Sequence, residues 1–320
     1  MIYPWPRREW LGHDLTPEHQ VRFQSESQGL VDSLSACLVA LTALIRPRAS
    51  TSQAATDTAQ VFCASGFLYK TDCFPLWITA GHVIDDINAY SRDANLFVSE
   101  LRLADSIASH VKPPAPFIII PNEPQYRISI VDDTAGIDHG AMILRPYIVD
   151  NLLKGPSRWI TSDMIARDDE VFDCYVLLGF PESARNPVLR ASGPDKRTVY
   201  FNISTPLLPL QRISPPDTPI DPNRSRLYFE ILPHFCTDPL APDEITSVAG
   251  MSGGPIFGVR FEQSQTITKL VGLQSAQGKE SRYLAACPLW DFPEHLSKRL
   301  RQYANGEWPI AAAAVGPTSP

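Results

Sequence analysis

The sequence GMSGGPIFGV occupies residues 250–259 and places Ser252 among glycines, just before an apolar strand-like run. A serine hydroxyl is a weak nucleophile, and the oxyanion that its attack creates needs backbone N–H donors aimed at one spot. Glycine lacks a Cβ atom and permits the tight, partly left-handed turn that would aim the amides of Gly250 and Ser252 at this oxyanion. The alternative is a glycine-rich hairpin turn without a chemical role.

The chain around this stretch reads as a β-protein from residue 61 onward. Short segments rich in β-branched and aromatic residues are bounded by Gly, Pro, Asn or Asp. Because no helices alternate with them, the pattern predicts an all-β barrel or sandwich core. The segments are VFCASGFLYK, FPLWITA, PFIII, YRISIV, GAMIL, VFDCYVLLG, TVYFNIS, LYFEIL, GPIFGV and KLVGLQS.

A base for the serine is available in WITAGHVI, residues 77–84, where a strand runs into His82. Histidine titrates near neutral pH, so it can take the serine proton and return it to a leaving amine. The small residues Ala80 and Gly81 leave room for other groups to approach it. A histidine at a strand end can also be an ordinary polar residue.

An acid that could orient the histidine occurs in IDHGAMIL, residues 137–144, where Asp138 stands immediately before an apolar strand. An aspartate there can accept the Nδ1–H of histidine and fix its tautomer. Aspartate before a strand is commonly a turn residue, and Asp132 and Asp133 are competitors for the role.

Together the three motifs resemble the chymotrypsin-like serine peptidase family in content and in order. TAGHV is similar to the family's TA-A-H segment, DHGAMIL to its D-I-A-L-L strand and GMSGGP to its G-x-S-G-G-P loop. SGFLY, LLGFP and VGLQS are further matches, and the resemblance runs from about residue 61 to residue 288. The family's disulfide beside the histidine has no counterpart, since Val83 follows His82, which is typical of bacterial-type or intracellular members.

The resemblance implies two packed six-stranded antiparallel β-barrels with a catalytic cleft between them. His82 and Asp138 would come from the first barrel and Ser252 from the second, with the amides of Gly250 and Ser252 as the oxyanion hole. Thr246 would lie at the floor of the specificity pocket. Its wall would be formed by Ser275, Ala276 and Gln277, which favours small or medium uncharged P1 residues in a protein or peptide substrate.

The domain division expected from these patterns is a lead, helix and linker over 1–60, a first barrel over 61–150, a second over 151–290, a helix over 291–306 and a disordered tail over 307–320. Val31, Leu34, Leu38, Leu41 and Ile45 recur at spacings of three and four, which predicts an amphipathic helix that ends before Pro47.

The C-terminal helix carries its own start and stop signals. Asp291 can cap it, Pro293 suits its first turn, Glu294 can complete a capping box and Gly306 can end it. Its apolar side would consist of Phe292, Leu296, Leu300 and Tyr303.

Composition limits the possible functions. The 320-residue chain is 44% hydrophobic with a formal net charge of -7, and it has no cationic block of the kind that binds nucleic acid. Its first residues lack the order of a secretory signal, and no apolar run is long enough to span a membrane. Six cysteines without C-x-x-C or metal-ligand spacing predict reduced, mostly buried thiols in a cytoplasmic protein that needs no metal or cofactor. Nothing in the sequence indicates an oligomeric state.

Two other functions fit parts of the pattern. The barrels could serve as a scaffold or binding module whose triad is idle. G-x-S-x-G also fits the nucleophile elbow of an α/β-hydrolase esterase, but that fold requires the order Ser, acid, His and a helix after the serine. Met251 replaces the acidic residue that pairs with a new N-terminus in peptidases activated by cleavage. We therefore expect a chain that is active as translated, with Met251 packed beneath the serine loop.

Overall fold

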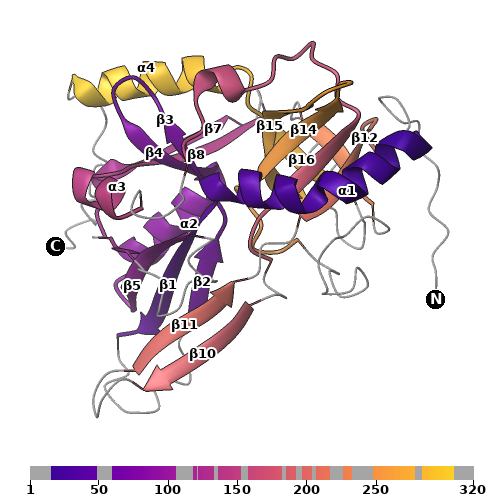
Figure 1. The fold of residues 1–320 in the computed structure, drawn as a ribbon. Helices are drawn as coiled ribbons and strands as arrows, with labels where there is room; N and C mark the ends of the chain where they lie inside the picture. The colour runs from indigo at the N-terminus through magenta and orange to yellow at the C-terminus, as the bar shows by residue number, and fades with distance from the viewer. Residues whose placement is uncertain are drawn as a thin grey trace.

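The computed structural model shows a mostly β-protein in two halves, with helices across them (Figure 1). It describes residues 16–48, 60–105, 118–120, 122–132, 136–152, 158–181, 185–191, 197–203, 207–216, 226–232, 248–277 and 283–305. The predicted tail over 307–320 and most of the predicted linker lie outside these residues.

The second half is a closed antiparallel barrel of six strands, which confirms one of the two predicted barrels. Its interior is filled by buried apolar side chains such as Leu177, Phe229 and Ile256. Around the barrel, the strand order is β12 (Leu207–Ile213), β13 (Leu227–Ile231), β16 (Tyr283–Pro288), β15 (Thr266–Gln277), β14 (Pro255–Phe261) and β9 (Cys174–Leu178).

The first half consists of two four-stranded sheets. The described strands therefore do not form the closed barrel that was predicted for this half. The two sheets touch through a bridge between Leu38 and Phe67. Helix α2 (Gly81–Arg92) packs against strands of both sheets. These strands are β5 (Leu96–Asp105) in one sheet and β7 (Arg127–Asp132) and β8 (Ile137–Ile143) in the other. One sheet has the order β2 (Gln60–Ala64), β1 (Val39–Pro47), β5 (Leu96–Asp105), β6 (Ile118–Ile119), and the other β3 (Phe67–Lys70), β4 (Pro75–Ala80), β8 (Ile137–Ile143), β7 (Arg127–Asp132).

Smaller elements connect these layers. The hairpin of β10 (Arg185–Ala191) and β11 (Arg197–Ile203) projects beyond the barrel toward the end of the first half that holds β1 and β2 (Figure 1). The shorter helices are α3 (Pro146–Leu152) and the 3-10 turns η1 (Ser35–Cys37), η4 (Pro124–Tyr126) and η5 (Ser162–Met164).

The helix predicted around residues 31–45 is wrong over most of its length. Helix α1 spans Pro17–Leu34, and the apolar run beyond it forms strand β1, which pairs with β2 and β5. Every residue of β1 from Val39 to Ile45 is buried. A strand buried on both faces has no polar alternation, so its apolar positions also fit a helical spacing.

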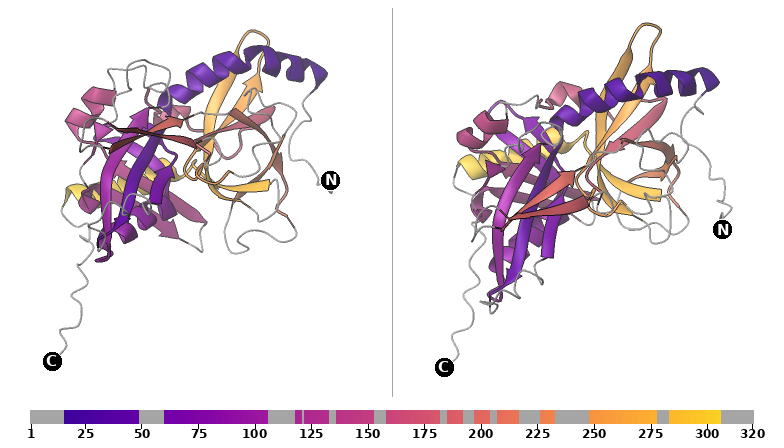
Figure 2. Two further views of the ribbon diagram at one scale, coloured as in Figure 1. Left: turned by 90° about the horizontal axis from the view of Figure 1, so that it is seen from below. Right: turned by 60° about the horizontal axis from the view of Figure 1, so that its bottom comes forward.

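Helix α1 bridges the two halves (Figure 2). It begins at Thr16, whose hydroxyl accepts a hydrogen bond from the amide of His19 at 3.2 Å. The Arg22 side chain of α1 donates hydrogen bonds to the carbonyl of Glu262 and to the hydroxyl of Thr266, both in the half that forms the barrel. Its other end leads through η1 into β1 of the first half. Helix α1 therefore contacts the barrel, and it lies earlier in the chain than the predicted helix.

Helix α4 (Phe292–Ala304) confirms the predicted C-terminal helix. Phe292, Leu296 and Leu300 are buried as expected, and Tyr303 packs against the core. The side chain of Asp291 makes no capping hydrogen bond, which differs from the prediction, and Gly306 lies outside the described residues. Phe292 contacts Tyr69 at 5.5 Å between ring centroids, so this helix covers the first half (Figure 1).

Four of the described cysteines are buried, namely Cys37, Cys63, Cys174 and Cys287, whereas Cys73 is exposed; all five are free thiols. In the part of the chain that the structure describes, no helix has the length and apolar character needed to cross a membrane.

Candidate active site

His82 lies in the first turn of α2, directly after strand β4. The sequence pattern placed the histidine at a strand end but missed the helix that follows. The signal was the spacing of Val83, Ile84 and Ile87, which are buried on one face of α2. The His82 side chain is 41% exposed, so it is accessible to a substrate.

Asp138 at the start of β8 holds His82 at two atoms. One carboxylate oxygen lies 2.9 Å from Nδ1 of His82, and the other accepts from the backbone amide of His82 at 2.9 Å. The carboxylate therefore also caps the N-terminus of α2, whose own N-cap residue, Ala80, makes no side-chain cap. With Nδ1 occupied in this way, Nε2 is the ring nitrogen left for a reacting group.

The environment of Asp138 keeps it ionised. The side chain is 4% exposed, and burial raises its pKa. The hydrogen bonds and charge of His82, with a smaller contribution from Arg226, outweigh burial and hold the pKa of Asp138 below its usual value. Of its two competitors, Asp132 is exposed at the end of β7, and Asp133 lies outside the described residues.

Two glycines allow the close approach of the histidine and aspartate segments. A Cβ atom on Gly81 would lie 2.9 Å from the Asp138 carboxylate, and one on Gly140 would lie 2.5 Å from the carbonyl oxygen of Ala80. Both distances are shorter than a real Cβ atom would allow. The positions before His82 and two after Asp138 therefore need glycine for the two segments to come this close.

Ser252 lies in the loop that leads into β14, and backbone hydrogen bonds fix this loop on three sides. Met251 donates to Val248 at 2.9 Å, Gly254 to Met251 at 2.7 Å and Gly253 to Gln274 at 2.8 Å. Gly250 and Gly253 have positive φ angles of 83° and 84°, the left-handed geometry expected from the glycine pattern. Ser252 itself is partly exposed.

Two amides of this loop have no backbone acceptor. Within the described residues, the N–H groups of Gly250 and Ser252 donate no backbone hydrogen bond, whereas those of Met251, Gly253 and Gly254 do. These two amides are those expected to form an oxyanion hole.

The serine loop and the histidine segment are in contact. A Cβ atom on Gly253 would lie 2.0 Å from the hydroxyl of Thr79 and 2.8 Å from the amide of Ala80. Gly253 follows Ser252, and Ala80 stands two positions before His82, so the serine loop of the barrel contacts the strand that leads to His82. Met251 is fully buried beneath the loop, as predicted.

The predicted substrate-binding residues fall in different places. Ser275 and Ala276 lie near the end of β15, whose pairing with β14 ends at Leu273. Gln277 accepts a hydrogen bond from the amide of Val248 at 3.1 Å through its side chain, so it faces the chain that leads to the serine. Thr246 lies outside the described residues.

Arg226, which directly precedes β13, is a neighbour of the site that no sequence motif indicated. Its guanidinium donates to the hydroxyl of Ser275, and its charge acts on Asp138. Its partners stand far from it in the sequence, so only the folded barrel shows that it belongs to the site.

His139 was also missed, although it follows Asp138 directly. It is buried, with Nε2 at 3.1 Å from the carbonyl of Pro288 and 3.2 Å from the sulfur of Cys287. These two partners belong to β16, so this histidine joins the Asp138 strand to the second barrel.

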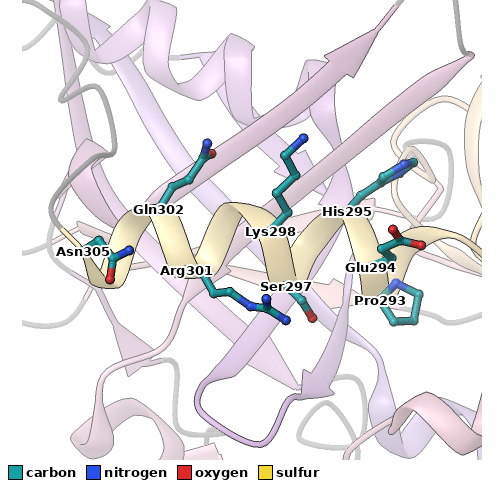
Figure 3. Close-up of a pocket in the computed structure, with 8 residues that line it drawn as sticks. All are labelled: Pro293, Glu294, His295, Ser297, Lys298, Arg301, Gln302 and Asn305. Carbon is teal, nitrogen blue, oxygen red and sulfur yellow. The ribbon is translucent and has the colours of Figure 1, made fainter.

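A separate hollow runs along α4, away from these residues (Figure 3). No side chain of the His82, Asp138 and Ser252 group lines it. Among the described residues, no group of three or more His, Cys, Asp or Glu side chains could hold a metal ion. The hollow along α4 is lined by Pro293, Glu294, His295, Ser297, Lys298, Arg301, Gln302 and Asn305.

No protein-family model and no curated sequence matches the chain. Several solved protease structures are similar to it at low identity. A catalytically inactive tobacco etch virus protease in complex with substrate has a TM-score of 0.38 and 13% identity, over 83% of this chain and 84% of that chain. A thermostable serine protease from an extremophilic microorganism has a TM-score of 0.38 and 12% identity, over 78% and 90%.

A third structure, the protease Anisep from Arthrobacter nicotinovorans, has a TM-score of 0.38 and 13% identity, over 77% of this chain and 89% of that chain. All three proteins are proteases by name.

Proposed function

We propose that this protein is a serine endopeptidase that hydrolyses peptide bonds through an acyl-enzyme on Ser252. The observation that carries the proposal is the pair of hydrogen bonds that His82 donates to the carboxylate of Asp138, formed near a glycine loop in which the amides of Gly250 and Ser252 donate no backbone hydrogen bond. Nucleophilic acyl transfer requires a serine activated by a histidine that a carboxylate orients, and the buried Asp138 with the accessible His82 supports this assignment.

In the first half-reaction, the Ser252 oxygen attacks the peptide carbonyl carbon and its proton passes to Nε2 of His82. Asp138 accepts the Nδ1–H and stabilises the imidazolium. The amides of Gly250 and Ser252 bind the oxyanion. His82 then gives the proton to the leaving amine as the C–N bond breaks, which leaves the acyl group on Ser252.

In the second half-reaction, water attacks the acyl carbon and gives a proton to His82. The proton returns to the Ser252 oxygen as the ester bond breaks, and the carboxylic acid product leaves. No metal or cofactor takes part in this sequence.

We expect the substrate to bind as an extended strand along the 274–277 edge, chiefly at Ser275 and Ala276. The pairing of β15 with β14 stops at Leu273, and the backbone of Gln274 still bonds to Gly253 and Gly254, so one side of the backbone at Ser275 and Ala276 is left for a peptide. With Ser275, Ala276 and Gln277 at the wall and the uncharged Thr246 at the floor, we expect cleavage after small or medium uncharged P1 residues. A peptide library cleaved mainly after Arg or Lys would contradict this preference and point to Asp243 or Glu244.

The proposal is tested by fluorophosphonate labelling and by peptide hydrolysis. Ser252→Ala should abolish labelling, and Ser252→Ala or His82→Ala should each lower kcat roughly 10⁶-fold, because the residues act as one unit. The double variant should be little worse than either single variant. Ser25→Ala, on the exposed face of α1, serves as the control and should retain full activity.

An idle scaffold would give a different result. The wild-type chain would then fail to label and fail to cleave any member of a broad peptide library. Labelling that survives Ser252→Ala would instead assign the nucleophile to another residue.

A further inference from the structure

Ser65 joins the two halves of the molecule at the serine loop. It lies between β2 and β3 of the first half and is fully buried. Its hydroxyl donates to the carbonyl of Gly250 at 2.9 Å and accepts from the amide of Phe180 at 2.9 Å, so it contacts two segments of the second half. A serine hydroxyl has one hydrogen to donate, and this one is committed to Gly250.

The backbone of Ser65 is itself fixed. Its carbonyl accepts from the hydroxyl of Thr79 at 2.7 Å, on the strand that leads to His82. The same carbonyl lies 2.5 Å from where a Cβ atom on Gly253 would be. Ser65 therefore contacts the histidine strand and both glycines that flank the Met251–Ser252 pair.

The Gly250 carbonyl needs such a partner because glycine can rotate its peptide planes at little cost. The peptide group between Gly250 and Met251 is held at both ends, by Ser65 at its carbonyl and by Val248 at its N–H. The next peptide group is held by the bond from Gly254 to the Met251 carbonyl. Because a trans peptide points its C=O and N–H in opposite directions, this bond turns the Ser252 N–H away from Gly254.

We propose that Ser65 is a positioning residue of the oxyanion hole, which holds the Gly250 peptide from the opposite half of the molecule. The inference rests on the proposed function of Ser252. In this chain, where Met251 cannot form an ion pair, the Ser65 hydroxyl supplies a side-chain hydrogen bond to the loop in addition to the loop's backbone hydrogen bonds. Ser65 would touch neither the substrate nor the reacting atoms.

The test is Ser65→Ala compared with Ser27→Ala. Ser27 is also buried, and its hydroxyl donates to the carbonyl of Gln24 within α1. Ser27→Ala therefore removes a buried hydroxyl of the same kind without touching the serine loop. Ser65→Ala should lower kcat by roughly 10- to 100-fold, less than the direct removal of an oxyanion donor, with KM changed less than twofold. Ser27→Ala should leave both constants within twofold.

A peptide boronic acid gives a readout that loss of stability alone would not produce. It forms a tetrahedral adduct on the serine, so Ser65→Ala should weaken its binding by the same factor as kcat, whereas binding of the cleaved product peptide should not change. Equal weakening of both ligands, or an unchanged kcat, would overturn the inference. If Ser65→Ala does not fold, Ser65→Cys retains a weak donor of similar size and should show a smaller loss of the same kind.

The two proposals fail in different ways. A wild-type chain without Ser252-dependent labelling removes the proposed function and the role of Ser65 with it. An active wild-type chain whose kcat does not depend on Ser65 removes the role of Ser65 alone.

Discussion

At the scale of single residues, each oxygen of the Asp138 carboxylate accepts a different hydrogen bond from His82. The carboxylate orients the ring of His82 and caps the helix that carries it, so the residue that sets the histidine tautomer also fixes the backbone beneath it. An isosteric amide could not do both, because one of its two atoms is a donor that would face an N–H of His82.

We therefore expect Asp138→Asn to lower kcat about 10⁴-fold, through the wrong tautomer of His82. The measurement is steady-state hydrolysis of a peptide amide, with folding checked by circular dichroism. Asp132→Asn, on an exposed residue of β7, is the control and should have little effect. A crippling Asp133→Asn beside a near-neutral Asp138→Asn would show that the acid has been assigned to the wrong residue.

Burial of His139 makes the stability of the fold depend on pH. Burial lowers its pKa from 6.5 to about 4, although the Pro288 carbonyl and the Asp138 charge act in the opposite direction. The unfolded chain then binds the proton more tightly between these values, so stability is full above pH 6.5 and falls as the pH drops toward 4. The loss attributable to this residue should reach roughly 3 kcal/mol.

His139→Gln removes this titration and isolates its effect. We expect urea unfolding to show a smaller loss of stability between pH 7 and pH 4.5 in the variant than in the wild type, whatever the variant's stability at pH 7. Equal losses in the two proteins would mean that His139 is not the group responsible.

At the scale of elements, the two terminal helices cross between the halves. Helix α1 precedes the first half but contacts the β14–β15 hairpin of the second, and α4 follows the second half but packs on the first. Each helix therefore stabilises the half to which it is not directly joined, so the packing of the two halves is supported from both ends of the described chain.

Phe23 on α1 is 1% exposed and tests this arrangement. Phe23→Ala should lower the free energy of unfolding by about 3–5 kcal/mol, because it removes a buried ring and leaves a cavity. Val21→Ala, on a residue that is 67% exposed on the same helix, should change it by less than about 0.5 kcal/mol. Chemical denaturation of both variants provides the comparison, and similar small losses would show that α1 is not packed as described.

The sequence pattern predicted the strands that alternate or carry β-branched residues, such as β4, β7 and β14, and also the C-terminal helix. It missed α2, whose polar residues Asp85 and Asp86 interrupt the apolar spacing, and it assigned β1 to a helix because a fully buried strand has no alternation. The pairing of His82 with Asp138 followed from motif order. The contacts of Ser65 and Arg226 could not be predicted, since they join residues far apart in the chain.

At the scale of the whole molecule, strand β1 ties the N-terminal region into the first half. It lies inside its sheet, with β2 on one side and β5 on the other, so it is part of the fold and not a removable leader. A segment that completes a sheet cannot be released without exposing the backbone groups of both neighbours.

We expect the protein to be active as translated, so a cut between residues 48 and 60 should leave fluorophosphonate labelling unchanged. The fragment ahead of the cut should stay bound through β1 and α1 during gel filtration. Uncut protein, handled in parallel, is the control. Labelling that appears only after cutting would make the region an inhibitory propeptide.

The bond between α1 and the β14–β15 hairpin also has a consequence for synthesis on the ribosome. Arg22 and its partner Glu262 stand 240 positions apart in the chain. At about 5–20 residues per second, α1 waits on the order of 10 to 50 s for that partner to be made. His82 and Asp138 are translated well before Ser252, which is made only near the end of this interval. A nascent chain would therefore carry the base and the acid without the nucleophile, and would be unable to cleave itself or its neighbours until the last strands emerge.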